Sequence, residues 1–213
     1  MLDVIIVEDD AFTRLSLVAA LSASGIRVVY DTDSASDALT NAERFLPHVA
    51  ILDLHLGRGP TGIDVARSLR RHNPRIGIVL LTSFDDPRLL GENLPAPPAG
   101  TQYLTKRSVT GIDKVVQAVG ASIRAINVSP TVTHTSPLEK LTGVQIETLR
   151  LIAHGLSNSE IAARRGIMTK SVEKSITRIC KSLNVETGPS TNQRVQIVKI
   201  FFLALGVSSL DPL

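Results

Sequence analysis

The chain has 213 residues, 43% of them hydrophobic and 20% charged, which is the composition of a globular protein with one large or two small domains. A single cysteine, Cys180, excludes a disulfide-stabilised scaffold and fits a reducing compartment. The sequence has neither a signal peptide nor an apolar run of the roughly 18 residues that a membrane span needs, so we expect a cytoplasmic protein without a membrane partner.

The net charge of +3 is concentrated in the C-terminal part of the chain. Residues 138–213 contain ten Lys and Arg against six Asp and Glu, whereas residues 1–129 are close to neutral. A basic C-terminal part suits a polyanionic partner, although many basic surfaces bind nothing.

The first 126 residues alternate short apolar runs with amphipathic helical patterns. We predict strands at residues 2–7, 26–30, 49–53, 76–81 and 102–105, and helices at residues 12–23, 34–45, 63–72 and 112–126. This alternation predicts an α/β domain with a doubly wound, five-stranded parallel sheet.

Residues 84–100 interrupt the alternation. Gly91 and three prolines between positions 95 and 98 cannot lie inside a helix, whereas Pro87 can begin one. We expect one or two helical turns followed by an irregular proline-rich segment. A shifted helix followed by a long loop is an equally good alternative.

Polar residues stand at the carboxyl ends of the predicted strands: Glu8, Asp9, Asp53, Thr82 and Lys106. For Asp53 alone, a helix cap or a turn is an equally good interpretation. The carboxyl ends of parallel strands share one edge, so these side chains should meet. Three crowded carboxylates are tolerable if a divalent cation lies between them, and oxygen ligands suit Mg²⁺. With Lys106 and Thr82, the group could hold a phosphoryl group on a carboxylate oxygen.

Four motifs in this order resemble the receiver domain of two-component response regulators, over residues 1–126: Val7-Glu8-Asp9-Asp10, Leu52-Asp53-Leu54, Leu81-Thr82-Ser83 and Tyr103-Leu104-Thr105-Lys106. The resemblance implies that Asp53 accepts phosphate from a sensor histidine kinase. It implies that Glu8, Asp9, Asp53 and the backbone carbonyl of His55 hold Mg²⁺. It also implies that Thr82 and Lys106 bind the phosphate, and that Tyr103 changes rotamer with it.

The loop at residues 57–62 departs from the receiver pattern because it lacks the usual proline and is longer by one residue. We expect the side chain of His55, just before it, to be a solvated loop residue rather than a metal ligand. Residues 127–137, rich in Ser, Thr and Pro and without Lys, Arg, Asp or Glu, are predicted to be an interdomain linker.

Residues 138–213 are predicted to form a small all-α domain. Thr142 is a candidate N-cap, Ser157 and Glu160 have the spacing of a capping box, and Gly166 marks a tight turn before a helix at about 170–183. Two helices joined by a glycine turn predict a helix-turn-helix. A helical bundle with an ordinary charged surface is the alternative for a generic basic helix.

Specific residues in this part resemble the LuxR-type helix-turn-helix over 138–205, including Gly155-Leu156-Ser157-Asn158, Glu160-Ile161-Ala162 and Ser171-Val172-Glu173-Lys174. The resemblance implies a recognition helix at 170–183 and a dimerising helix at 191–205. The expected DNA-binding residues are Lys170, Ser171, Glu173, Lys174, Thr177, Arg178 and Lys181. Gly143 and Gln145 replace a common Pro and Glu, which predicts a looser start of the first helix.

The whole chain is similar to response regulators of the NarL/FixJ type. This implies a transcriptional regulator rather than an enzyme, switched by phosphorylation of Asp53 and binding double-stranded DNA as a homodimer. The alternatives are a receiver that mainly docks protein partners and a DNA-binding protein independent of phosphorylation. A phosphohydrolase is disfavoured because His55 stands where a general-acid Asp would be expected.

Overall fold

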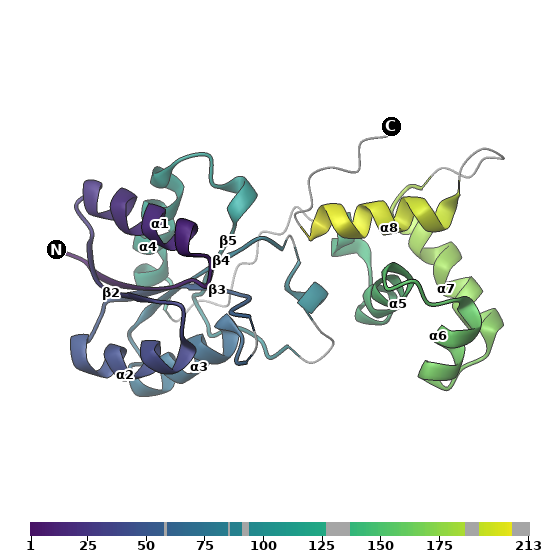
Figure 1. Ribbon diagram of the computed structural model, residues 1–213, viewed down its shortest axis with the longest axis horizontal. Helices are drawn as coiled ribbons and strands as arrows, with labels where there is room; N and C mark the ends of the chain where they lie inside the picture. Colours follow the sequence, from purple (N-terminus) through teal and green to yellow (C-terminus); the bar gives the residue numbers. More distant parts are fainter. Residues whose placement is uncertain (58, 85, 91–93, 127–136, 186–191, 206–213) are drawn as a thin grey trace. The chain divides into compact units, whose positions relative to one another are not determined.

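The computed structural model describes residues 1–57, 59–84, 86–90, 94–126, 137–185 and 192–205 (Figure 1). The chain divides into two compact units, residues 1–83 with 95–133, and residues 84–94 with 134–213. Most of the expected linker, 127–136, and the expected start of the last helix at residue 191 lie outside the described residues. Among the described helices, none has the length and apolar character of a membrane span.

The first unit contains the parallel sheet that the sequence predicts. Its strands follow the order β2-β1-β3-β4-β5, and all four pairings are parallel. The strands are β1 (Asp3–Val7), β2 (Arg27–Thr32), β3 (Val49–Asp53), β4 (Gly77–Thr82) and β5 (Gln102–Thr105). The order reverses between β1 and β3, and this switch point is where open α/β sheets bind ligands.

Four helices cover the two faces of this sheet (Figure 1): α1 (Ala11–Ala23), α2 (Ala35–Phe45), α3 (Gly62–His72) and α4 (Ile112–Arg124). Helices α1 and α4 lie on one face, and α2 and α3 lie on the other. Strands β3 and β4 are buried along their whole length because both faces are covered, which explains their continuous apolar sequence.

The segment between β4 and β5 contains a short 3₁₀ helix, η1 (Pro87–Leu90). Residues 94–98 are irregular, and residues 85 and 91–93 lie outside the described residues. The expectation of a helical turn followed by an irregular proline-rich stretch is therefore confirmed for the described residues. The proline ring fixes the backbone and removes a donor, which prevents a longer helix through 95–98.

The second unit is helical, as predicted, and consists of η3 (Pro137–Lys140), α5 (Gly143–Ala153), α6 (Asn158–Arg165), α7 (Thr169–Ser182) and α8 (Gln193–Ala204) among the described residues. Helices α6 and α7 are joined by Gly166, whose φ of 63° is the left-handed conformation that glycine adopts easily. The expected capping box of Ser157 and Glu160 is present at the start of α6.

The prediction that Gly143 and Gln145 loosen the first helix of this unit is wrong. The side chain of Thr142 accepts a hydrogen bond from the Gln145 backbone N–H, and the Thr142 backbone N–H donates to Gln145 Oε1 at 2.8 Å. Glutamine serves at the third helical position of a capping box as glutamate does. The start of α5 therefore has two of its backbone donors satisfied.

Candidate functional site

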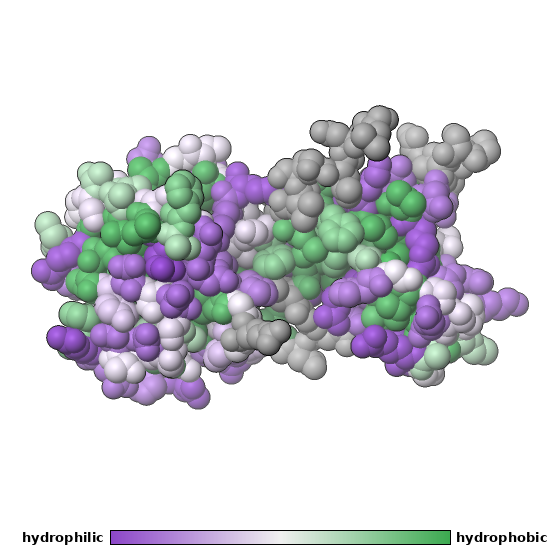
Figure 2. Space-filling model, in the orientation of Figure 1, coloured by the Kyte–Doolittle hydropathy of each residue, from purple (hydrophilic) through white to green (hydrophobic). Residues whose placement is uncertain are grey.

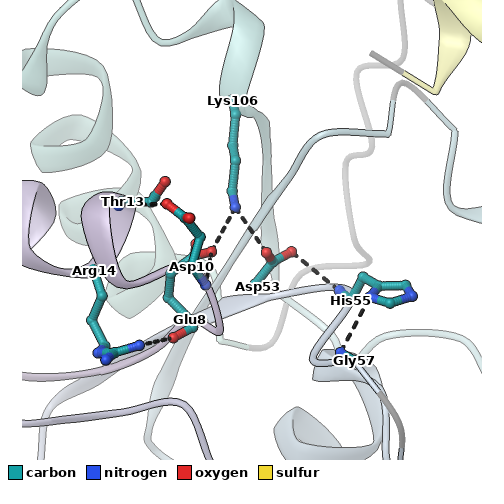
Figure 3. Close-up of polar contacts among 8 residues, drawn as sticks. All are labelled: Glu8, Asp10, Thr13, Arg14, Asp53, His55, Gly57 and Lys106. Atoms are coloured by element: carbon teal, nitrogen blue, oxygen red, sulfur yellow. Dashed lines mark hydrogen bonds and ion pairs between the residues drawn. The ribbon is translucent and has the colours of Figure 1, made fainter. Parts of the chain in front are cut away.

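Three carboxylates lie at the edge where β1 and β3 end. Glu8 and Asp9 follow β1 and Asp53 is the last residue of β3, and one oxygen from each lies within 4.8 Å of the others. Figure 3 shows two of them, Glu8 and Asp53. Glu8 and Asp53 are buried, whereas Asp9 is exposed. The predicted acidic cluster is thus formed by adjacent parallel strands, as the sequence argument requires.

Lys106 connects two of these carboxylates. Its Nζ lies 2.8 Å from Glu8 Oε1 and 2.8 Å from Asp53 Oδ2, and its side chain comes from the residue after β5. The ammonium group partly compensates the negative charge of the cluster. Lys106 thus reaches across the end of the sheet to the Asp53 carboxylate (Figure 3).

Burial dominates the electrostatics of Glu8. Its side chain is 1% exposed, and burial raises its pKa from 4.5 to about 7; the hydrogen bond from Lys106 opposes the rise and the charge of Asp53 adds to it. For Lys106, burial acts to lower the pKa, but the hydrogen bonds to Asp53 and Glu8 outweigh it, so the pKa is raised. The pair therefore keeps Lys106 positively charged while Glu8 retains its proton more tightly than an exposed carboxyl group.

One oxygen of Glu8, Oε2, is buried without a hydrogen-bond partner. A buried carboxylate oxygen without a donor is costly, and a cation at the cluster would remove that cost. The donor set consists of carboxylate oxygens only, which is the chemistry that Mg²⁺ prefers. These observations fit a divalent cation held by Glu8, Asp9 and Asp53.

The carboxylate of Asp53 is held at both oxygens. Oδ1 accepts a hydrogen bond from the His55 backbone N–H at 3.1 Å, while Oδ2 faces Lys106. The His55 side chain is exposed, and its Nδ1 accepts a hydrogen bond from the Gly57 backbone N–H at 3.2 Å. That the backbone carbonyl of His55 is a ligand of the metal stays a prediction.

Glycine at position 62 allows α3 to begin directly against the end of β3. A Cβ atom there would lie 2.0 Å from the Asp53 carbonyl oxygen. The adjacent Thr61 caps α3 and forms a capping box with Asp64, which fixes the far end of the loop. The loop between β3 and α3 is therefore anchored at both of its ends.

Thr82 and Tyr103 lie on the neighbouring strands. Thr82, at the end of β4, is fully buried and follows Leu81, which is in register with Asp53. Tyr103 is half-buried on β5, in register with Leu80 and two residues before the end of its strand. Thr82 thus stands at the same edge as the acidic cluster, and the roles of both residues towards a phosphoryl group stay predictions.

Two residues that support the cluster were not predicted. Arg14 on α1 donates to the Glu8 carbonyl oxygen at 2.6 Å, and the Asp10 backbone N–H donates to Glu8 Oε1 at 3.3 Å. Asp10 also caps α1 through a hydrogen bond from the Thr13 backbone N–H. An acidic residue before a helical pattern is a cap signal, but nothing in the sequence indicates the contact of Arg14.

A second candidate surface lies on α7. Val172, Ile179 and Cys180 face the core of the second unit. The seven residues expected to bind DNA are all exposed: Lys170, Ser171, Glu173, Lys174, Thr177, Arg178 and Lys181. Helix α7 is thus amphipathic and presents a cationic, hydrogen-bonding face to solvent.

Comparison with known families assigns both units. The model described as "Response regulator receiver domain" matches residues 4–119, which is more than half of the chain. The chain belongs to the response regulator family. Residues 139–198 of this response regulator match the model described as "Bacterial regulatory proteins, luxR family". The family consists of DNA-binding transcription regulators and is not a class of enzymes.

Curated relatives are similar over nearly the whole chain. The response regulator is 27% identical to the DNA-binding transcriptional activator DevR/DosR of Mycobacterium tuberculosis, covering 87% of this chain and 90% of the relative. It is 29% identical to the response regulator protein VraR of Staphylococcus aureus, covering 86% and 90%. Both alignments span the receiver and the helix-turn-helix, so the order of the two units is shared.

Solved structures of RcsB have a similar fold. A structure of two RcsB dimers bound to two parallel DNAs has a TM-score of 0.60 and 21% identity, covering 97% of this chain and 99% of the other. RcsB from Salmonella enterica serovar Typhimurium, bound to a promoter in the presence of the phosphomimetic BeF₃⁻, has a TM-score of 0.51 and 22% identity, covering 94% and 98%.

Proposed function

We propose that this response regulator controls transcription by binding DNA, and that phosphorylation of Asp53 switches its activity. The observation that supports the proposal is the buried Asp53 carboxylate, which belongs to the acidic cluster and contacts Lys106. The same chain carries an exposed recognition helix, α7. The donor is a phosphohistidine of a sensor kinase.

Glu8, Asp9 and Asp53 would hold Mg²⁺, which offsets negative charge on the transferred phosphoryl group. An oxygen of Asp53 forms a bond to phosphorus while the phosphorus–nitrogen bond of the phosphohistidine breaks and its electron pair returns to the imidazole. Lys106 and the Thr82 hydroxyl then bind phosphoryl oxygens. The ammonium group of Lys106, now shared with Glu8, supplies the positive charge nearest to the new anion.

The recognition helix α7 would enter the major groove. Lys174, Arg178 and Lys181 contact phosphates, which sets the register on the duplex, and Glu173 and Thr177 face base edges. A carboxylate such as that of Glu173 can accept a hydrogen bond from the amino group of cytosine. The contacts to phosphate predict binding that weakens steeply with salt.

A homodimer would form through α8. Helix α8 exposes hydrophobic side chains as well as burying them, and Figure 2 shows apolar surface over this helix. Val195 and Leu203 are 49% and 44% exposed. They lie eight residues apart, about 80° around the helix axis, and so on the same side of the helix. An exposed apolar helical face needs a partner to be removed from water. A second copy of α8 supplies one, and a two-fold dimer would place two recognition helices on two half-sites.

The test combines phosphorylation and DNA binding. The full chain is treated with Mg²⁺ and acetyl phosphate, and its mass and its affinity for upstream and random DNA are measured at several salt concentrations. We expect one phosphoryl group and a change in sequence-specific affinity, both absent in Asp53→Asn and present in the matched control Asp113→Asn. If the protein prefers upstream DNA but its affinity does not change with acetyl phosphate, it is a DNA-binding protein that does not depend on phosphorylation. If it shows no preference among DNA sequences, a receiver that mainly docks protein partners is favoured.

A further inference from the structure

The segment between β4 and β5 is packed into the helical unit. Leu89 on η1 is 4% exposed and belongs to the same hydrophobic cluster as Leu138, Leu141 and Ile146. Phe84 is half-buried and packs against this cluster. In sequence, however, this segment lies between two strands of the receiver sheet. A stretch of chain between two receiver strands therefore forms part of the core of the DNA-binding unit.

A polar contact fixes the same segment. The Arg88 guanidinium donates to the carbonyl oxygens of Leu141 at 2.7 Å and Leu138 at 3.1 Å. Leu138 lies in η3 and Leu141 directly follows it, before the start of α5. Asp86, 1% exposed, holds that guanidinium at 2.6 Å, and its Oδ1 also accepts the Arg88 backbone N–H at 2.9 Å. The Asp86 carboxylate is buried whereas the Arg88 side chain is 40% exposed, so the cost of breaking the pair falls mainly on Asp86. Because the same guanidinium also binds two backbone carbonyl oxygens, its hydrogen bonds fix one geometry.

The segment packed into the helical unit, residues 84–90, begins very close to the proposed phosphoryl-binding residue Thr82. Only Ser83 separates Thr82, at the end of β4, from Phe84. Two residue steps span at most roughly 7 Å of extended chain. Because this connection is so short, a movement of Thr82 is transmitted to Phe84. The chain thus connects the acidic cluster to the core of the helical unit without passing through the interdomain linker.

We propose that residues 84–90 couple the two functions, with η1 acting as a docked element of the DNA-binding unit that moves with Thr82. This inference rests on the proposed function, since it supplies the route by which phosphorylation of Asp53 reaches the DNA-binding helices. When Thr82 binds the phosphoryl group, the end of β4 shifts and pulls on η1, and the contacts of Arg88 and Leu89 pass the change to η3 and α5. A phosphoryl group can shift an equilibrium only if it interacts more favourably with one of two states of the protein. Here the two states are the one with η1 docked in the helical unit and the one with η1 displaced from it.

The first experiment tests the docking itself by hydrogen exchange on the full, unphosphorylated chain. In Leu89→Ala, amides of η3 and α5 should exchange at least tenfold faster than in the wild type, while amides of β3 keep their rates. The matched control is Leu46→Ala, whose side chain is 70% exposed. Faster exchange in the receiver strands with α5 unchanged would overturn the assignment of η1 to the DNA-binding unit.

The second experiment tests coupling in a folded protein. Arg88→Lys retains the positive charge and the apolar core but loses the fork that reaches both carbonyl groups. The affinity for specific DNA is measured with and without Mg²⁺ and beryllofluoride, in the wild type, in Arg88→Lys and in the exposed control Arg75→Lys. We expect a response of roughly fivefold or more in the wild type and the control, within the usual range of allosteric coupling, and less than about twofold in Arg88→Lys.

The outcomes separate the two proposals. A wild-type protein whose DNA affinity ignores beryllofluoride would refute the proposed switch, and the hydrogen-exchange result would still decide whether η1 is docked. A wild type that responds, together with an Arg88→Lys variant that responds equally, would overturn the coupling role of η1 and leave the proposed function intact.

Discussion

Replacing Glu8 by Gln tests the electrostatics of the acidic cluster. Burial raises the pKa of Glu8 from 4.5 to about 7. Because the folded protein holds this proton more tightly than the unfolded chain, the associated stability is fully present below pH of about 4.5 and is lost as the pH rises through about 7. A pKa difference of this size corresponds to about 3 kcal/mol of unfolding free energy above pH 7.

Glutamine has nearly the same shape, can still accept a hydrogen bond from Lys106 and carries no charge. In the absence of Mg²⁺ at pH 8, Glu8→Gln should therefore increase the unfolding free energy of the receiver, by up to about 3 kcal/mol. At pH 5.5 the advantage should be smaller by about 2 kcal/mol, because the pH is then only about one unit above the unfolded-state pKa of 4.5, and taking up the proton on folding costs the wild type only about 1.4 kcal/mol.

Hydrogen exchange of β3 amides in EDTA, corrected for the intrinsic rate at each pH, reports the opening of the receiver alone. Glu43→Gln is the matched control, since the side chain of Glu43 is 66% exposed. Adding Mg²⁺ at pH 8 should protect the wild type more than Glu8→Gln, which lacks one ligand. A variant that is no more stable at pH 8, or whose advantage does not change with pH, would refute the reasoning.

Three further predictions concern the site loop and the helical unit. Gly62→Ala, which drives a Cβ atom into the Asp53 carbonyl oxygen, should lower the receiver's thermal midpoint and its acetyl phosphate labelling, whereas Gly111→Ala, with open space around it, should not. Lys174→Ala should weaken binding to all DNA sequences and reduce the slope of log affinity against log salt by about 1; an unchanged slope would place Lys174 away from phosphate. Ser157→Ala should destabilise α6 by about 1 kcal/mol in denaturant unfolding, through the lost cap, and an unchanged midpoint would contradict this.

Much of the fold was determined by local sequence. Continuous apolar runs predicted β3 and β4, and the cap signals at Thr142 and Ser157 marked where helices begin. These features depend on neighbours within a few residues, so the sequence contains them directly. Even the meeting of Glu8, Asp9 and Asp53 followed from parallel strand order, since each acid ends a strand.

The tertiary structure decided what depends on distant residues. Strand order predicted Lys106 at the same sheet edge, but only the structure shows that its Nζ lies 2.8 Å from both Glu8 and Asp53, which are 98 and 53 positions away. The raised pKa of Glu8 likewise comes from burial by elements that surround it in space. Sequence explained why residues 84–100 are not a long helix, but only the packed structure assigned Leu89 and Arg88 to the core of the helical unit. Local patterns specify which element forms, whereas burial and charge pairing depend on which elements meet.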